Sequence, residues 1–69
     1  MRVQNYNEII GTVRSVSNDN ELVHVLLGFD IKIDIPVSAI CIEKLKKHLG
    51  KKVGIFNNNG AYIIKEVKK

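Results

Sequence analysis

Hydrophobic and polar residues alternate along the stretch 21–37, ELVHVLLGFDIKIDIPV. Every second residue is apolar on each side of a Gly-Phe-Asp tripeptide, in two sets: Val23, Val25 and Leu27, then Ile31, Ile33, Ile35 and Val37. Because successive side chains of a strand point to opposite faces, each set predicts a strand with one apolar face toward a core. The stretch therefore predicts a β-hairpin.

The apolar faces of the two strands fix the register of this hairpin. With Val25 opposite Ile33, the alternating apolar residues of both strands share one face: Val23, Val25, Leu27, Ile31, Ile33 and Ile35. A shift by one residue would set Val25 opposite Lys32 and break that match. The favoured register needs a loop of odd length, such as 28–30. On the outer face it pairs the following residues: His24 with Asp34, and Leu26 with Lys32.

The stretch 8–16, EIIGTVRSV, predicts the first strand. Gly11 in its middle favours a bulge or a sharp bend. Val16 falls on the opposite face from Val13 if the alternation is strict, so we expect the pattern to change near Ser15. A long, bent first strand suits a small barrel, because one strand can then serve both of its sheets.

A short amphipathic helix is predicted at 39–49. Three apolar residues recur at helical spacing: Ile42, Leu45 and Leu49. Ser38 is the expected N-cap, and Gly50 the expected left-handed cap at the other end. So short a helix must pack its apolar stripe against the sheet. Cys41 lies beside this stripe and is expected to be an inert core residue, since free cysteine is among the most buried residue types.

The last third of the chain predicts a second hairpin, with strands at 52–56 and 61–67. The turn between them contains Asn-Gly, the pair best suited to a tight type I′ turn. Two registers stay open at this point. A two-residue turn pairs Ile55 with Ile64, whereas a three-residue loop pairs Ile55 with Ile63.

The predicted order is three strands, a helix and two strands. This order, with Gly11 in the first strand, resembles the OB-fold, a five-stranded Greek-key barrel with its helix between strands three and four. The resemblance spans nearly the whole chain and implies a mainly β fold with a single domain over 1–69. An SH3-like barrel is the alternative. The core is expected to contain these residues: Val23, Val25, Leu27, Ile31, Ile33, Ile35, Leu45, Leu49, Val53 and Ile55.

Two segments also resemble molybdate-binding TOBE domains, which are themselves OB-like. One is the Gly-x-Val sequence at 11–13, and the other is the leucine-containing helix that runs into Gly-Lys-Lys-Val at 50–53. This second resemblance implies the binding of a small anion.

Composition points to an intracellular chain. Cys41 is the only cysteine, so no intrachain disulfide can form, which favours a reducing, cytoplasmic location. Segment 2–7 is polar, has Tyr6 as its only large apolar anchor, and lacks the apolar core of a secretory signal. No apolar run approaches the ~20 residues of a membrane-spanning helix.

The formal net charge is +4. Most of the basic residues lie late in the chain: Lys44, Lys46, Lys47, Lys51, Lys52, Lys65, Lys68 and Lys69. A basic balance permits phosphate contacts with nucleic acid. A solvated helix face with a solubilising tail explains the same lysines equally well.

No catalytic or metal-binding constellation is present. His24 and His48 are the only histidines, and His24 lies between Leu22 and Leu26 rather than near a nucleophile. A single cysteine, two distant histidines and scattered carboxylates fit no recognised metal-site spacing. We therefore expect no enzymatic activity, no metal and no cofactor.

The OB resemblance implies a nucleic-acid surface on the outer face of strands two and three, flanked by the loops after strands one and four. By position, the candidate residues are Arg14, Asn18, Asn20, His24, Lys32, Asn57, Asn58 and Asn59. Single-strand binders stack bases on aromatic rings, and this face has none unless Phe29 or Tyr62 turns toward it. Asp19, Asp30 and Asp34 would repel phosphate.

The same face predicts a rival function. Leu22 and Leu26 point outward in the favoured register, which is typical of a protein-contact patch or a dimer seam. Three hypotheses follow: a module for single-stranded nucleic acid, a protein-interaction or self-association module, and a small-anion binder of the TOBE type.

Overall fold

The computed structural model describes residues 2–67. Its elements in chain order are β1 (Glu8–Asn18), β2 (Leu22–Leu27), β3 (Ile31–Pro36), a 3-10 helix (Val37–Ala39), α1 (Ile42–Lys46), β4 (Lys52–Asn58) and β5 (Ala61–Glu66). All strand pairs are antiparallel. The mainly β fold class, with a short helix between the third and fourth strands, is confirmed.

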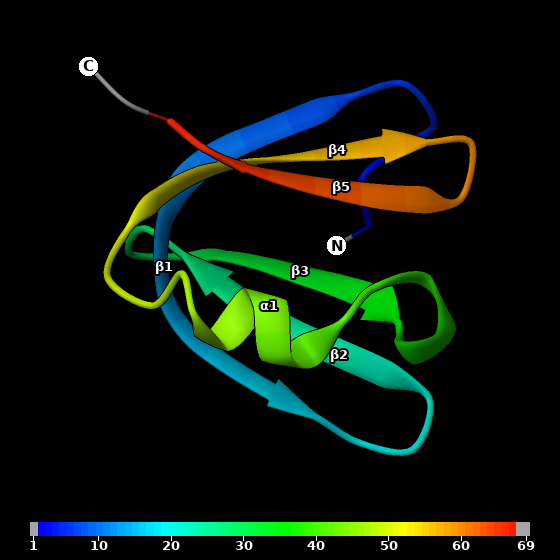
Figure 1. Ribbon diagram of the computed structural model, residues 1–69, viewed down its shortest axis with the longest axis horizontal. Coiled ribbons are helices and arrows are strands. Elements are labelled where there is room, and N and C mark those ends of the chain that lie inside the picture. The colour runs from blue at the N-terminus through cyan, green and yellow to red at the C-terminus, as the bar shows by residue number, and fades with distance from the viewer. Residues whose placement is uncertain (1, 68–69) are drawn as a thin grey trace.

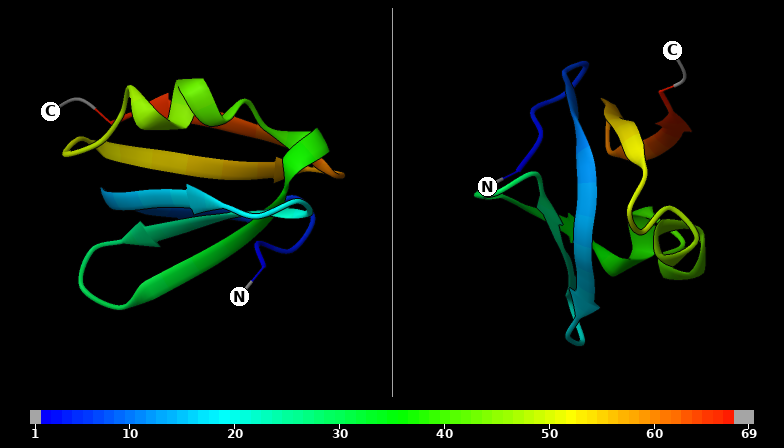
Figure 2. Two further views of the ribbon diagram at one scale, coloured as in Figure 1. Left: turned by 90° about the horizontal axis from the view of Figure 1, so that it is seen from below. Right: turned by 90° about the vertical axis from the view of Figure 1, so that its left-hand side faces the viewer.

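β1 connects the two hairpins of the sheet, whose strand order is β3-β2-β1-β4-β5. Residues 8–12 of β1 pair with β4, and residues 13–18 pair with β2. In Figure 1, β1 curves from one hairpin to the other, and the right-hand view of Figure 2 shows it running the height of the molecule. The register shift between Val13 and Ser15 confirms the expected change of pattern. The bulge turns Val16 back toward the core side.

The sheet is open, and this corrects the expectation of a closed barrel. Within residues 2–67 no ladder joins β3 to β5. Side chains from outside the sheet complete the core instead: Val3, before β1, is 3% exposed, and Leu45 of α1 is 0% exposed. Tyr6, the expected anchor of the N-terminal segment, is 64% exposed, so that assignment was wrong and Val3 takes the role.

The first hairpin has the predicted register. Val25 pairs with Ile33, and the loop spans 28–30. The inward residues of both strands are fully buried except Ile31, which is half-buried. The alternation of apolar residues was therefore sufficient to fix both the pairing and the buried face.

The second hairpin resolves the two open registers. Ile55 pairs with Ile64, so the turn consists of Asn59 and Gly60 alone. Both residues have positive φ, 51° and 96°, as a type I′ turn requires.

The helix is shorter than the predicted 39–49. Ser38 lies within the 3-10 helix rather than at an N-cap, and Cys41, which precedes α1, is exposed. At the other end, Gly50 donates its N–H to the carbonyl of Val13 at 2.8 Å, with φ of 81°. This contact with β1 diverts the chain from a helical path and leaves Leu49 48% exposed. The prediction of a buried Leu49 was wrong for this reason. The prediction of a buried Cys41 was wrong because Cys41 stands before α1 in extended backbone and is not part of the apolar stripe of the helix.

Among residues 2–67 there is no helix with both the length and the apolar character needed to cross a membrane.

Candidate functional site

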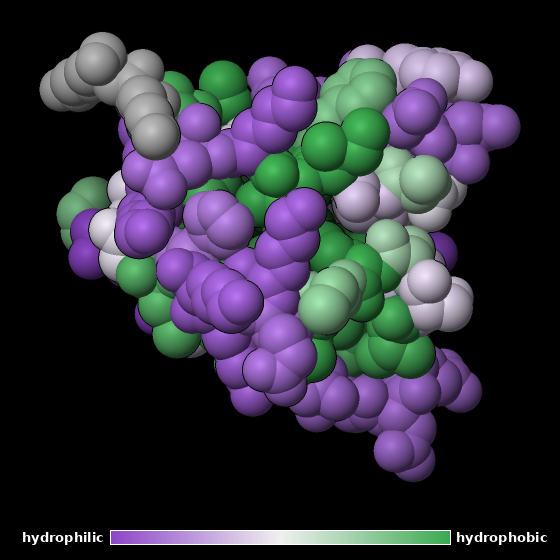
Figure 3. Space-filling view, in the orientation of Figure 1, coloured by the Kyte–Doolittle hydropathy of each residue, from purple (hydrophilic) through white to green (hydrophobic). Residues whose placement is uncertain are grey.

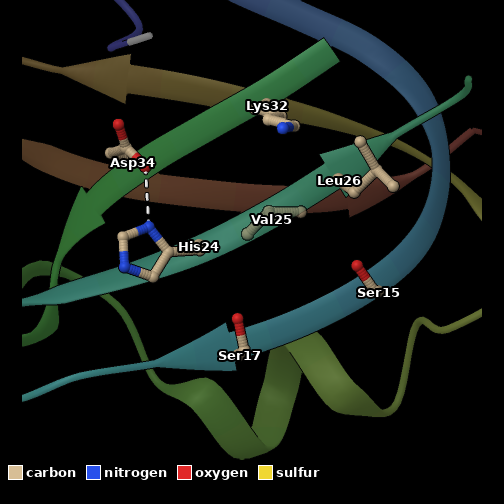
Figure 4. Close-up of a pocket in the computed structure, with 7 residues that line it drawn as sticks. All are labelled: Ser15, Ser17, His24, Val25, Leu26, Lys32 and Asp34. Atoms are coloured by element: carbon tan, nitrogen blue, oxygen red, sulfur yellow. Dashed lines mark hydrogen bonds and ion pairs between the residues drawn. The ribbon is translucent and has the colours of Figure 1, made fainter. Parts of the chain in front are cut away.

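A hollow of about 280 Å³ lies on the outer face of β1, β2 and β3. The side chains of three strands border it in Figure 4, where His24 and Asp34 point toward one another. The residues that line it are Ser15, Ser17, His24, Val25, Leu26, Lys32 and Asp34. This is the face on which the sequence predicted a binding surface.

Strand alternation and the β1 bulge together build the hollow. While Val25 and Ile33 point into the core, their neighbours on β2 and β3 point outward. Beyond the bulge, Ser15 pairs with Leu26 and Ser17 pairs with His24. Small serine side chains on β1 leave room beside the larger residues of β2, which explains a concavity at this place.

His24 is held between two carboxylates at one end of the hollow. Its Nδ1 lies 2.8 Å from Asp34 Oδ1, and its Nε2 lies 3.1 Å from Asp19 Oδ2. The cross-strand pair with Asp34 was predicted, but the contact with Asp19 was missed. Because Asp19 lies in a loop that the strand pattern leaves unspecified, no periodicity signal could have found it.

The carboxylate of Asp19 also organises the loop between β1 and β2. Its Oδ1 accepts the backbone N–H groups of Glu21 and Leu22, at 2.8 and 2.7 Å. These backbone bonds, with a smaller contribution from His24, lower the pKa of Asp19 to about 2. The bond to His24 also lowers the pKa of Asp34, and the bonds to Asp34 and then Asp19 raise the pKa of His24.

An aromatic and basic cluster lies near the β2–β3 turn. The Arg14 guanidinium lies 5.4 Å from the centre of the Phe29 ring, within the range of a cation–π contact. Phe29 is 92% exposed. Lys32, on the outer face of β3, is also exposed and lines the hollow. Phe29 is therefore an exposed aromatic ring at the β2–β3 turn, but neither Phe29 nor Arg14 lines the hollow itself.

Tyr62, the other aromatic candidate, has a different role. It is half-buried, and its hydroxyl lies 3.5 Å from the carbonyl of Val3. It therefore supports the N-terminal segment.

Of the five predicted asparagines, four are exposed and one is buried. Asn18, Asn20, Asn58 and Asn59 are exposed. Asn57 is 5% exposed and uses its amide within the fold, so the structure removes it from the candidate surface. Val53, Ile55 and Asn57 lie two residues apart on the inward face of β4. The period-2 pattern could thus have placed Asn57 inside.

Leu22 and Leu26 are half-buried, so they expose less apolar surface than the sequence suggested. More strongly exposed apolar side chains lie on the outer face of the other half of the sheet, where Ile10 is 50% and Ile63 40% exposed. A second hollow of about 290 Å³ adjoins them, lined by Glu8, Gly54, Phe56, Ile63 and Lys65.

The lysines of α1 face solvent. Lys44 and Lys46 in α1 and Lys47 after it are all exposed, and the surface over α1 is hydrophilic in Figure 3. They lie apart from the hollow between β1 and β3. Across residues 2–67, no group of three or more histidine, cysteine, aspartate or glutamate side chains is arranged to hold a metal ion.

In comparisons with known proteins, no family model, no curated protein and no solved structure matches this chain.

Proposed function

We propose that this protein is a non-enzymatic module that binds single-stranded nucleic acid on the outer face of β1, β2 and β3. The strand order β3-β2-β1-β4-β5, with a helix between β3 and β4, supports an OB-type arrangement of the chain. In that arrangement this face and the loops after β1 and β4 bind the strand.

The observation that carries the proposal is the pairing of Phe29 with Arg14. A ring that is 92% exposed leaves apolar surface in water, and the adjacent guanidinium offers both positive charge and a second stacking plane. Unstacked bases bind to such aromatic and guanidinium planes without regard to sequence.

The neighbouring groups supply the remaining contacts. Arg14, at the bulge of β1, and Lys32, on the outer face of β3, are both exposed, and each can contact a phosphate of a strand whose base stacks on Phe29. The exposed amides of Asn20, in the loop after β1, and of Asn58, at the end of β4, can bond to base edges. A single strand fits these contacts better than a duplex, because its bases can turn outward onto the ring.

Fluorescence anisotropy with labelled twelve-nucleotide dT and rU strands tests this proposal. We expect wild-type binding that weakens steeply with salt, and loss of binding in Arg14→Glu/Lys32→Glu. The matched control is Lys44→Glu/Lys47→Glu, which changes net charge by the same amount on the surface around α1 and should retain most of the affinity.

Two results would reject the proposal. One is the absence of binding by the wild type at low salt. The other is equal loss in the two double variants, which would indicate that net charge rather than this face attracts the strand.

A second candidate is self-association through the other outer face. The exposure of Ile10 and Ile63 favours it over the half-buried Leu22 and Leu26. Glu8 and Lys65 carry opposite charges at the hollow beside Ile63, so a two-fold contact can set Glu8 of one copy against Lys65 of the other. Analytical ultracentrifugation tests this: Ile63→Lys should shift a wild-type dimer to monomer, and a wild type that is monomeric at high concentration rejects it.

A further inference from the structure

Both ring nitrogens of His24 face carboxylate oxygens. Asp34 Oδ1 lies 2.8 Å from Nδ1, and Asp19 Oδ2 lies 3.1 Å from Nε2. A neutral imidazole carries only one N–H, so it can satisfy only one of these two acceptors. The imidazolium form donates to both. The geometry of the site is therefore that of a protonated histidine.

We infer that the proton on His24 controls nucleic-acid binding at the hollow, so that affinity is higher when His24 is protonated and falls as it loses the proton. This inference rests on the proposed function, because it concerns the same surface. It assigns His24 the role of a positioning and charge-setting residue rather than a direct ligand of a base.

Within residues 2–67, the groups beside His24 come from β1, the loop after it and β3, and those of the loop and β3 are charged. β1 contributes Ser17, which is uncharged, and the following loop contributes the carboxylate of Asp19. β3 contributes the carboxylate of Asp34 and the ammonium of Lys32, both of which line the hollow and make further interactions. With its proton, the cluster of His24, Asp19 and Asp34 has a net charge of about −1 by the usual charges of these groups, and without it about −2.

The extra negative charge acts on a phosphate bound at Lys32. The side chains of His24 and Asp34 are 42% and 35% exposed, so water screens the repulsion strongly. We accordingly expect a two- to tenfold effect on affinity rather than an all-or-none switch, because one additional charge acts only weakly through water near a surface.

The loop itself should not depend on the proton. Asp19 Oδ1 holds two backbone N–H groups without help from His24, and Asp19 N–H donates to the carbonyl of Leu22 at 2.9 Å. The predicted effect is thus a change of charge at a fixed site. This separates it from unfolding of the loop, which would also weaken binding.

Two measurements on the intact protein test the inference. Long-range ¹H–¹⁵N NMR of the imidazole reports the protonation of both nitrogens of His24 across the pH range. Anisotropy with the labelled dT strand, at constant ionic strength, reports affinity at the same pH values for the wild type, His24→Gln and His48→Gln. His48 is the matched control, because its Nδ1 bonds to the carbonyl of Lys44 near α1, away from the hollow.

We expect affinity in the wild type and in His48→Gln to fall two- to tenfold as His24 deprotonates, and affinity in His24→Gln to be independent of that step. A His24 that titrates at or below its ordinary range, or a pH dependence that persists in His24→Gln, overturns the inference while leaving strand binding intact. Absence of strand binding at every pH rejects the proposed function, and the inference falls with it.

Discussion

The side-chain amide of Asn57 donates a hydrogen bond to the carbonyl oxygen of Val3 at 2.7 Å. The same side chain accepts the backbone N–H of Gly60 through Oδ1, also at 2.7 Å. Asn57 is the one buried polar residue among those described, and it joins the N-terminal segment to the β4–β5 turn. Both of its polar atoms are occupied inside the protein, so its function is structural.

Replacing Asn57 by alanine should lower the free energy of unfolding by about 1–3 kcal/mol, because the Val3 carbonyl would lose its shorter hydrogen bond and the Gly60 N–H would lose its acceptor. Urea unfolding followed by circular dichroism measures the change. Asn58→Ala, at the exposed neighbouring position, is the control and should change stability by less than about 0.5 kcal/mol. Equal effects in the two variants would contradict the structural role of Asn57.

Ile33→Ala should cost about 2–5 kcal/mol of unfolding free energy, the usual range for removing a large side chain from a core. Ile33 is 0% exposed and pairs with Val25 across the hairpin. For a domain this small, that is a large share of its total stability.

Ile63→Ala is the comparison for Ile33→Ala, since the same truncation at a 40% exposed site leaves no cavity. A loss below about 1 kcal/mol for Ile33→Ala would mean that the inward face of the first hairpin has been misassigned.

Ile33 and Asn57 show where the sequence was informative and where it was not. Ile33 was predicted to be buried because β2 and β3 alternate strictly, and a shift of one residue would expose the whole apolar face. Asn57 follows the same alternation in β4, but its polarity and its place in an asparagine run suggested a surface loop. Buried polar residues are recognised by their hydrogen-bond partners, and Val3 lies 54 residues away in the chain.

The ends of the helix could not be predicted for a related reason. Helical spacing continues to Leu49, but Gly50 and Lys51 bond to the backbone of Val13 instead. That contact joins segments 36 or more residues apart in the chain, beside the bulge of β1, so it is a property of the folded sheet. In the candidate site, strand register predicted the pair of His24 and Asp34. It could not predict the contact of His24 with Asp19, because Asp19 lies in a loop.

The stability of the protein should depend on pH through His24. Bonds to Asp34 and then Asp19 raise the pKa of His24 above its usual 6.5. A raised pKa contributes stability that is fully present below pH 6.5 and is lost as pH rises through the folded-state value. The thermal midpoint of the wild type should therefore exceed that of His24→Gln most clearly below pH 6.5, and the difference should shrink in alkali.

The contribution of Asp19 to folding stability depends on pH in the opposite direction. Its pKa is lowered from 3.8 to about 2, so its contribution is present above pH 3.8 and is lost as pH falls through about 2. The advantage of the wild type over Asp19→Asn should accordingly disappear in strong acid. Parallel midpoint curves for the wild type and either variant, across the whole pH range, would contradict these assignments.

The last prediction separates stacking from charge at the proposed nucleic-acid surface. Phe29→Ala should weaken binding of the labelled dT strand by about 5- to 150-fold, because base–aromatic stacking contributes ~1–3 kcal/mol per base. Folding stability should change little, since Phe29 is 92% exposed. The dependence of affinity on salt should also stay unchanged, because salt dependence counts phosphate contacts and Phe29 makes none. Arg14→Ala should instead reduce the salt dependence as well as the affinity, and Phe29→Trp should retain binding. A Phe29→Ala variant that binds as tightly as the wild type would show that this ring does not stack on bases.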